Sequence, residues 1–392
     1  MNNNNSVKRN IVLIGILNLL MEFKLYGAIC ILYFVSITKS IALGMSIFSI
    51  TMLSAAILEI PTGALSDKIG RKKTIILGTI ASLIYIILFA ISENYIVLVI
   101  GAIFEGLERA LFSGNNEALI YDTLKELKKE DEYDKYLGKT NSMYYFAGII
   151  GGVLGGIIAY ITSYKVIMYI SIIPRIINII ISLLIKEPKT KINTENKFFE
   201  KMFNSLRITM KNKILREQVI ADSITQGIGE ATFQIRSEFY KLVWPQWALG
   251  IPNALSNIGS FLGNWFSDKI IKKIGNKKTI IIGEVYSIIS NVVAVLSKNI
   301  ISPIIMVTNS IIPTGVVKST ISQSLYKDEY RSSMASIKSF LGSIMYAIFA
   351  IIIGIIADIK GIVFTIAIAQ LIKVISIIIY IRIFKNNKEI RI

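Results

Sequence analysis

The segment SDKIGRKKTII occupies residues 66–76, and a close copy, SDKIIKKIGNKKTII, occupies residues 267–281. Each copy joins an aspartate and a glycine to a run of basic residues, about half the chain length apart. The tripeptide DEY also occurs twice, at residues 131–133 and 328–330. Two motifs repeated in the same order at similar spacing predict two homologous halves that arose by duplication.

The composition predicts a polytopic membrane protein. Of the 392 residues, 53% are hydrophobic, and the mean hydropathy is +0.59, which exceeds what a soluble core of this size requires. The formal charge of +17 lies in short gaps between apolar runs. This pattern is typical of loops and argues against a nucleic-acid-binding face. The bilayer and a small-molecule substrate are therefore the expected partners.

Several classes of chemistry lack the residues that they need. The chain has one cysteine and no histidine, which excludes a disulfide framework and argues against a metal centre or an enzyme. No G-x-x-x-x-G-K-[ST] phosphate loop occurs. We expect no cofactor, and energy from an ion gradient, here a proton gradient.

A helix needs about 20 apolar residues to cross the hydrocarbon core, and this length gives twelve expected spans. They are residues 11–37, 41–65, 74–91, 95–120, 141–161, 166–185, 219–240, 248–266, 279–296, 300–325, 333–357 and 362–384. Lys and Arg crowd into alternate gaps, which predicts that both termini are cytoplasmic.

These spans divide the chain into five expected parts. Residues 1–10 are a cytoplasmic N-terminus, 11–185 and 217–384 are six-helix bundles, 186–216 are a cytoplasmic linker, and 385–392 are a cytoplasmic tail. Within the linker, KFFEKMFNSLRITMK predicts an amphipathic helix that lies on the inner leaflet, with Phe198, Phe199, Met202, Phe203 and Leu206 on one face.

The first basic repeat carries a family signature. GALSDKIGRKKTI follows the pattern G-x-L-x-D-[RK]-x-G-[RK]-[RK], and so resembles the major facilitator superfamily; the matching residues are Gly63, Leu65, Asp67, Lys68, Gly70, Arg71 and Lys72. The resemblance implies an all-α fold of twelve transmembrane helices in two pseudo-symmetric halves. It also implies transport by alternating access. The second copy departs from the pattern, because Gly263 stands five residues before Asp268 and residues 271–274 lengthen the loop.

The same residues have a physical interpretation as a cytoplasmic gate. Gly63 and Gly70 permit close backbone approach, Asp67 suits a neighbouring helix N-terminus, and Arg71 can reach a carboxylate, for which Asp122 is the candidate. The alternative is that these are ordinary membrane-surface charges. The expected gating residues are Gly63, Asp67, Gly70, Arg71, Lys72, Asp122 and Asp268.

Charges inside spans are costly and therefore indicate function. On the first span, Asn18, Glu22, Tyr26, Ile29 and Tyr33 share one face of a continuous helix, with Lys24 opposite. Glu22 lies near the expected midplane, where burial disfavours the charged carboxylate, as a proton carrier requires. The alternative is a structural hydrogen bond inside the bundle.

Two further spans carry charged stripes. The fourth presents Glu105, Glu108, Arg109, Phe112 and Asn116 on one face, with Glu105 and Arg109 as an i,i+4 pair that either relays protons or neutralises itself. The seventh presents a polar stripe toward a wet cavity, and Lys318 is expected to balance one of its acidic residues. The stripe consists of Asp222, Gln226 and Glu230.

The fifth span reads AGIIGGVLGG, in which closely spaced glycines allow helices to pack tightly. Gly151, Gly155 and Gly156 match the antiporter signature G-P-x-x-G-G of the family, and Gly152 stands in place of its proline. The resemblance implies export, whereas the plain interpretation is a packing face.

Together these observations predict a drug-efflux-like secondary transporter, a monomer in a bacterial cell membrane, that exports small amphipathic compounds in exchange for protons. The proton-coupling candidates are Glu22, Glu105, Glu108, Asp222 and Glu230; the substrate-cavity candidates are Asn18, Tyr26, Arg109, Phe112, Asn116, Gln226 and Lys318. One alternative is uptake or exchange of an anionic metabolite bound by Arg109 and Lys318. A more distant alternative is a membrane sensor that does not transport.

Overall fold

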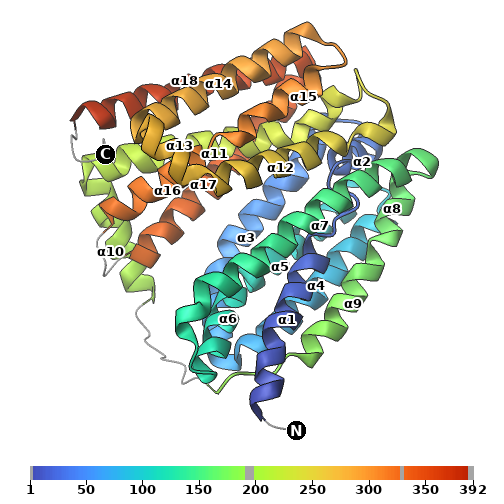
Figure 1. Cartoon of the computed structure of the whole chain (residues 1–392). Coiled ribbons are helices and arrows are strands. Elements are labelled where there is room, and N and C mark those ends of the chain that lie inside the picture. The colour runs from blue at the N-terminus through green and yellow to red at the C-terminus, as the bar shows by residue number, and fades with distance from the viewer. Residues whose placement is uncertain (1–2, 190–197, 327–330, 387–392) are drawn as a thin grey trace. The chain divides into compact units, whose positions relative to one another are not determined.

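The computed structural model describes residues 3–189, 198–326 and 331–386, which form helices and no strands (Figure 1). This confirms the expected all-α fold. Contacts group the chain into two compact units. Unit 1 comprises Met1–Lys39, Ile50–Thr194 and Gln246–Ala254, and unit 2 comprises Ser40–Ser49, Glu195–Pro245 and Leu255–Ile392.

Unit 1 contains the helices of the first six expected spans and the short helix η2. They are α1 (Asn3–Glu22), α2 (Cys30–Thr38), α3 (Ile41–Ile69, from Ile50 onward), α4 (Arg71–Ile91), α5 (Tyr95–Phe112), α6 (Asn115–Glu126), η1 (Glu130–Glu132), α7 (Tyr133–Ile161), α8 (Tyr164–Ile170), α9 (Ile172–Leu184) and η2 (Gln246–Ala248).

Unit 2 contains the linker helix and the helices of the last six expected spans. They are α10 (Phe198–Lys211), α11 (Lys213–Tyr240), α12 (Ile251–Trp265, from Leu255 onward), α13 (Ser267–Ile274), α14 (Asn276–Ser297), α15 (Ser302–Val307), η3 (Thr308–Ile311), α16 (Thr314–Leu325), α17 (Arg331–Lys360) and α18 (Ile362–Asn386).

Within the residues that the structure describes, eight helical segments are long and apolar enough to cross a membrane. They correspond to the second, third, fifth, sixth and ninth to twelfth expected spans. The first, fourth, seventh and eighth differ because each is interrupted, short or charged. The first, fourth and seventh are also spans in which polar residues were expected to face the pathway.

The continuous helix expected over residues 11–37 is wrong. The helix α1 ends at Glu22, residues 23–29 form turns, and α2 begins at Cys30. The predicted face of Asn18, Glu22, Tyr26, Ile29 and Tyr33 is therefore broken after Glu22. The fourth span is also interrupted, because Gly114 adopts φ 70° between α5 and α6.

Equivalent helices build the core of each unit. In unit 1 an apolar cluster joins α1, α4, α5 and α6, through residues such as Leu17, Ile75 and Leu119. In unit 2 the corresponding cluster joins α11, α14, α16 and α18, through Ala221, Ile280 and Val317. In each unit the cluster thus combines the first, third and fourth spans of the repeat, as two copies of one design require.

Ser40–Ser49, at the start of the second span, pack with α17 within unit 2. The Asp358 carboxylate accepts hydrogen bonds from the Ser40 hydroxyl at 2.6 Å and from the backbone amides of Ile41 at 2.8 Å and Ala42 at 3.0 Å. A carboxylate at a helix N-terminus satisfies free amides and complements the macrodipole. Asp358 therefore holds the start of α3 against the end of α17.

The segment between the halves, where the sequence predicts an amphipathic linker helix, contains the helix α10. Its Ser205 and Thr209 are buried, and Ile208 packs against the cluster of Leu215, Tyr326 and Met334. One face of α10 thus contacts helices of unit 2. The side chains of residues 198–203, which carry most of the expected apolar face, lie outside the described part of the structure.

Candidate functional site

The break in the first span is stabilised by complete pairing of its backbone carbonyls. The last four carbonyls of a helix lack partners within it. Here Leu19 accepts from the Phe23 amide, and Glu22 accepts from the Lys24 amide. Leu20 and Met21 accept from the guanidinium of Arg175, at 3.1 and 2.8 Å. Arg175 is fully buried on α9 and caps the end of α1. The break is therefore a stable part of the fold.

Tyrosines hold the Arg175 side chain in place. Its second terminal nitrogen donates to the Tyr85 hydroxyl at 3.1 Å, and Tyr85 in turn bonds to the Tyr26 hydroxyl at 2.9 Å. Tyr26, expected to line a cavity, is instead buried in this network. Arg175 is a charged residue in the middle of an apolar span, which predicts a position in the cavity or the packed interior rather than against lipid.

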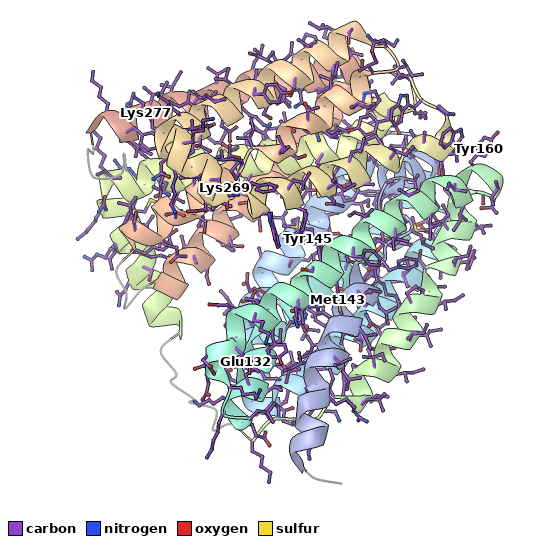
Figure 2. The ribbon with its side chains drawn as sticks, in the orientation of Figure 1. Glu132, Met143, Tyr145, Tyr160, Lys269 and Lys277 are labelled. Atoms are coloured by element: carbon purple, nitrogen blue, oxygen red, sulfur yellow. The ribbon has the colours of Figure 1, made fainter. Side chains whose placement is uncertain are left out.

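The glycines of the fifth span receive the unwound segment. A Cβ on Gly155 would overlap the Leu25 carbonyl oxygen, and one on Gly151 would lie 3.2 Å from the Lys24 amide nitrogen. Met143 of the same helix, labelled in Figure 2, contacts Gly15 of α1. Residues 148–156 therefore do more than let two helices pack closely, because Gly151 and Gly155 make room for backbone that is not helical.

Charged groups of unit 1 pair around this break. The Lys24 ammonium lies 3.4 Å from the Glu22 carboxylate. A continuous helix would have put these two side chains on opposite faces and left Lys24 without a defined partner. Arg109 donates to Glu105 at 2.9 Å, which confirms the predicted i,i+4 pair, and Glu105 also accepts from Thr51 at 3.3 Å. Two of the predicted proton carriers are thus neutralised by a neighbouring cation.

Glu108 differs from these paired carboxylates. It is 4% exposed, and it makes no hydrogen bond or ion pair within residues 3–189, 198–326 and 331–386. Lys24, Arg175 and Arg109 lie within electrostatic reach, yet each is bonded to another group. Glu108 is the buried carboxyl group of unit 1 whose charge is least compensated.

Other residues predicted for the substrate cavity of unit 1 divide between polar and apolar surroundings. The Asn116 amide donates to Asn18 at 3.0 Å, which brings together two predicted residues from α6 and α1. Phe112, in contrast, belongs to the apolar cluster and packs against Gly78. Its position is that of a core residue.

In unit 2 the expected stripe on the seventh span has two environments. Asp222 is buried, where the Lys338 ammonium lies 2.5 Å from its carboxylate and the Tyr380 hydroxyl donates to it. Gln226 and Glu230 are exposed on the same helix. The three residues recur regularly along the helix, but Asp222 is buried whereas Gln226 and Glu230 are exposed.

Lys318 does not balance this stripe. Its ammonium lies 2.7 Å from the carboxylate of Glu284 on α14, and both side chains are largely buried. The expected pairing with a carboxylate of the seventh span is wrong. Glu284 was missed, as were Arg236 and Lys373, although each is a charged residue within an apolar span.

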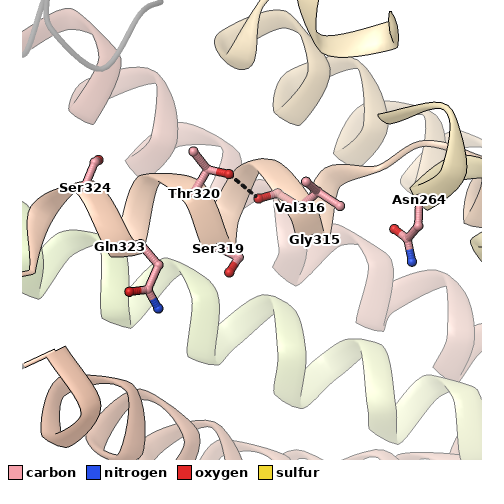
Figure 3. Close-up of a pocket in the computed structure, with 7 residues that line it drawn as sticks. All are labelled: Asn264, Gly315, Val316, Ser319, Thr320, Gln323 and Ser324. Carbon is pink, nitrogen blue, oxygen red and sulfur yellow. Dashed lines mark hydrogen bonds between the residues drawn. The ribbon is translucent and has the colours of Figure 1, made fainter. Parts of the chain in front are cut away.

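A cavity of about 800 Å³ opens along α16. Asn264 comes from the end of α12, and the other lining residues come from α16 (Figure 3). The lining residues are Asn264, Gly315, Val316, Ser319, Thr320, Gln323 and Ser324. Five of these residues carry a hydroxyl or amide group, although apolar atoms make up most of the lining surface, so the cavity offers hydrogen-bonding groups on an apolar background.

The two basic repeats adopt one backbone conformation. Gly70 precedes α4 with φ 95° and ψ 161°, and Gly275 precedes α14 with φ 84° and ψ 155°. Such angles are accessible essentially to glycine alone. The four additional residues of the second copy form part of the short helix α13, which explains the longer spacing without a change at the glycine.

The first repeat also binds a carboxylate that the sequence did not indicate. Glu187, which follows α9, accepts from the Arg71 and Lys72 amides at 2.7 and 2.8 Å and so caps the N-terminus of α4. The Arg71 side chain bonds to Ser66, Asn115 and Asp67. Asp122, its expected partner, is not among these contacts of Arg71 within the described residues.

The remaining gating candidates are placed as follows. Gly63 lies on α3 with open space around it, Asp122 lies on α6, and Asp268 pairs with Lys272 at 2.9 Å on α13. In the second repeat the acidic residue is therefore exposed and paired within its own helix. The two repeats share their glycine geometry and the pairing of the aspartate with a basic residue four positions later, and the first also binds Glu187.

Alanine at Gly70 is expected to destabilise the protein more than alanine at Gly275. Both substitutions force an L-residue into a glycine conformation, at about 1–3 kcal/mol each. At Gly70 the added Cβ would also lie 2.9 Å from a Glu187 oxygen, whereas at Gly275 nothing lies within 4 Å. Thermal unfolding of the two variants measures the difference, and equal losses would remove the Glu187 cap from the explanation.

The repeated units and the buried charges within membrane-length helices define a multi-pass membrane protein of the transporter class. The sequence matches the family model of the Major Facilitator Superfamily over residues 11–326. The chain therefore belongs to the major facilitator superfamily. Among curated proteins, none matches the sequence.

Solved structures share this fold at low sequence identity. A bacterial homologue of the human lysosomal transporter Spinster, inward-facing and unoccupied, has 14% identity and a TM-score of 0.77, over 99% of this chain and 98% of that one. A point mutant of the nucleoside transporter NupG has 14% identity and a TM-score of 0.77, over 96% and 99%. A D-xylose–proton symporter has 12% identity and a TM-score of 0.76, over 96% and 97%.

Proposed function

We propose that this chain is a proton-coupled secondary transporter that exports small amphipathic compounds by alternating access. The observation that carries the proton coupling is Glu108, a buried carboxyl group that bonds to no cation among the described residues. A carboxyl group within a membrane span can bind and release a proton, and its charge must be compensated in one of the two states.

The surroundings of Glu108 support this assignment. Lys24, Arg109 and Arg175 surround it from three different elements, and Glu105 adds a negative charge from its own helix. Lys24 pairs with Glu22, Arg109 donates to Glu105, and Arg175 donates to the end of α1. A shift of the unwound segment or of Arg109 would change which cation Glu108 faces. Proton binding and helix movement would then be linked.

Export is supported by the glycines of the fifth span, which resemble the antiporter signature of the family. The alternative function, uptake or exchange of an anionic metabolite, requires Arg109 and Lys318 to be free to bind the anion. Each of them is bonded to a carboxylate, Arg109 to Glu105 and Lys318 to Glu284. The polar face of α16, with its 800 Å³ cavity, is our candidate for the surface that contacts the polar part of the compound.

We place the transporter in a bacterial cell membrane as a monomer with both termini in the cytoplasm. The basic loops support this orientation, because Lys and Arg concentrate on the cytoplasmic side of membrane proteins. In this orientation the Asp67–Arg71 pair and the Glu187 cap lie on the cytoplasmic side, where we propose that they hold the gate.

Flux into vesicles tests the proposal. Purified protein reconstituted in liposomes with an acidic lumen is expected to accumulate the amphipathic cation ethidium. Exchange of one proton per molecule gives about tenfold accumulation for each pH unit, because one unit corresponds to a tenfold difference in proton activity. A proton ionophore should abolish the accumulation, and protein-free liposomes are the control. Flux of ethidium that ignores the imposed gradient would contradict proton coupling.

A further inference from the structure

The cavity along α16 contains two kinds of polar side chain. The Thr320 hydroxyl donates to the Val316 carbonyl at 3.0 Å, and the Ser324 hydroxyl donates to the Ile321 carbonyl at 2.9 Å. Both bonds lie within α16 itself, and Figure 3 shows the first of them. The hydrogens of these two hydroxyl groups are therefore already donated to the helix.

Three other side chains of the lining have no such partner. Asn264, Ser319 and Gln323 are exposed, and their side chains form no hydrogen bond with any residue that the structure describes. Figure 3 shows Ser319 and Gln323 on one side of α16, and Thr320 and Ser324 on the other. The cavity thus presents two carboxamide groups and one hydroxyl group that the described residues leave unpaired.

The unpaired groups of α16 share one face of the helix, and this face has open space beside it. Gly315, Ser319 and Gln323 follow one another at intervals of four residues, which places them on one side with about 6 Å between successive Cα atoms. A Cβ added to Gly315 would meet no atom within 4 Å. All three residues line the same cavity, so a ligand in it could reach both side chains.

The lining of this cavity is uncharged. None of its seven residues is acidic or basic. The neighbouring Lys318 ammonium lies 2.7 Å from the Glu284 carboxylate of α14, and both side chains are largely buried. A charged group that entered the cavity would give up water without gaining an opposite charge from the lining. An uncharged group that donates and accepts hydrogen bonds would exchange water for the Ser319 hydroxyl and the two carboxamides.

We propose that this cavity binds an uncharged, hydrogen-bonding group of the transported compound, a carboxamide or a hydroxyl group, with Asn264, Ser319 and Gln323 as its partners. The inference rests on the proposed function, because it names the part of the amphipathic compound that unit 2 recognises. The volume of about 800 Å³ lies within the range of small-molecule sites, about 300–1,000 Å³. For a cation such as ethidium, the aromatic amino groups would bind here, and the charge would lie outside the cavity.

Three head groups on one tail test this selectivity. The probes are para-butylbenzamide, which is uncharged, para-butylbenzoate, an anion, and para-butylbenzamidinium, a cation of the same planar shape. Each is titrated against the full-length protein in nanodiscs by equilibrium dialysis, and empty nanodiscs correct for partition into lipid. The Kd of the benzamide is expected to be at least about tenfold lower than that of either ion. Saturable binding of an ion with an equal or lower Kd overturns the proposal, and so does a lack of saturable benzamide binding.

Substitutions on α16 connect the selectivity with the cavity. Ser319→Ala and Gln323→Leu are expected to raise the Kd of para-butylbenzamide about three- to tenfold, because each removes one hydrogen-bonding group. Gln323→Glu keeps the shape but adds a negative charge, so it should bind para-butylbenzamidinium more tightly than para-butylbenzamide. The matched control is Ser297→Ala at the end of α14, where the hydroxyl donates to the Ala294 carbonyl at 3.2 Å. Its Kd should stay within about twofold of wild type.

The variants can also overturn the site. Benzamide binding at the wild-type Kd in both Ser319→Ala and Gln323→Leu would do so, as would an unchanged preference in Gln323→Glu. The binding assay and the vesicle assay fail independently. If ethidium accumulates with the proton gradient but the benzamide does not bind, export stands and the assignment of the cavity is wrong. If the benzamide binds selectively but ethidium flux ignores the gradient, the cavity stands and proton-coupled export is wrong.

Discussion

Glu108→Gln is expected to abolish proton-driven accumulation of ethidium while leaving exchange of the compound across the membrane intact. Glutamine has nearly the size of glutamate and can form hydrogen bonds, but it cannot bind or release a proton. The accumulation ratio should fall from about tenfold per pH unit to one. Counterflow, in which labelled ethidium exchanges for unlabelled ethidium without a gradient, should stay within about twofold of wild type.

Two controls define what this result would mean. Glu93→Gln removes an exposed carboxylate that pairs with Lys165 at 3.3 Å and should leave accumulation unchanged. Glu22→Gln tests the rival carrier, which is already paired with Lys24. If Glu108→Gln accumulates ethidium as well as wild type while Glu22→Gln does not, the proton site lies on the first span.

Gly155→Ala is expected to be among the most destabilising single-methyl changes in unit 1. The new Cβ would overlap the Leu25 carbonyl oxygen, so α7 or the unwound segment must move. Overpacking of this kind costs about 3 kcal/mol. The movement would also disturb the end of α1 that Arg175 caps. Thermal unfolding in detergent, followed by size-exclusion chromatography, measures the loss.

Gly138→Ala on the same helix is the matched control. Nothing lies within 4 Å of its added Cβ. Alanine is a better helix former than glycine by about 1 kcal/mol, so Gly138→Ala should unfold at a slightly higher temperature than wild type. If both variants lose stability equally, close approach at Gly155 is not the cause.

The fold could be predicted from the sequence because its signals are long and redundant. Apolar length, loop charge and the repeated SDKI segments each indicate the same duplicated arrangement of helices. The pairing of Glu105 with Arg109 was also predictable, because residues four apart meet on any α-helix. Local periodicity is sufficient for these features, and the structure agrees with them.

The charged contacts between helices could not be predicted in the same way. Periodicity gives the face of a continuous helix, but the first span is interrupted after Glu22, and every side chain beyond that point changes direction. The partners of Arg71 and Lys318 depend on how helices far apart in sequence pack. Glu284, Arg236 and Lys373 are charged residues inside expected spans. The rule that such charges indicate function would have identified all three.

The capped end of α1 also limits which amino-acid substitutions unit 1 can accept. Because Arg175 and neighbouring amides satisfy all four terminal carbonyls, the interruption needs no ligand to persist. The arginine, its tyrosine supports and Gly155 serve one local geometry. We therefore expect these residues to be retained or replaced together, because each of them contributes to the local geometry only when the others are present.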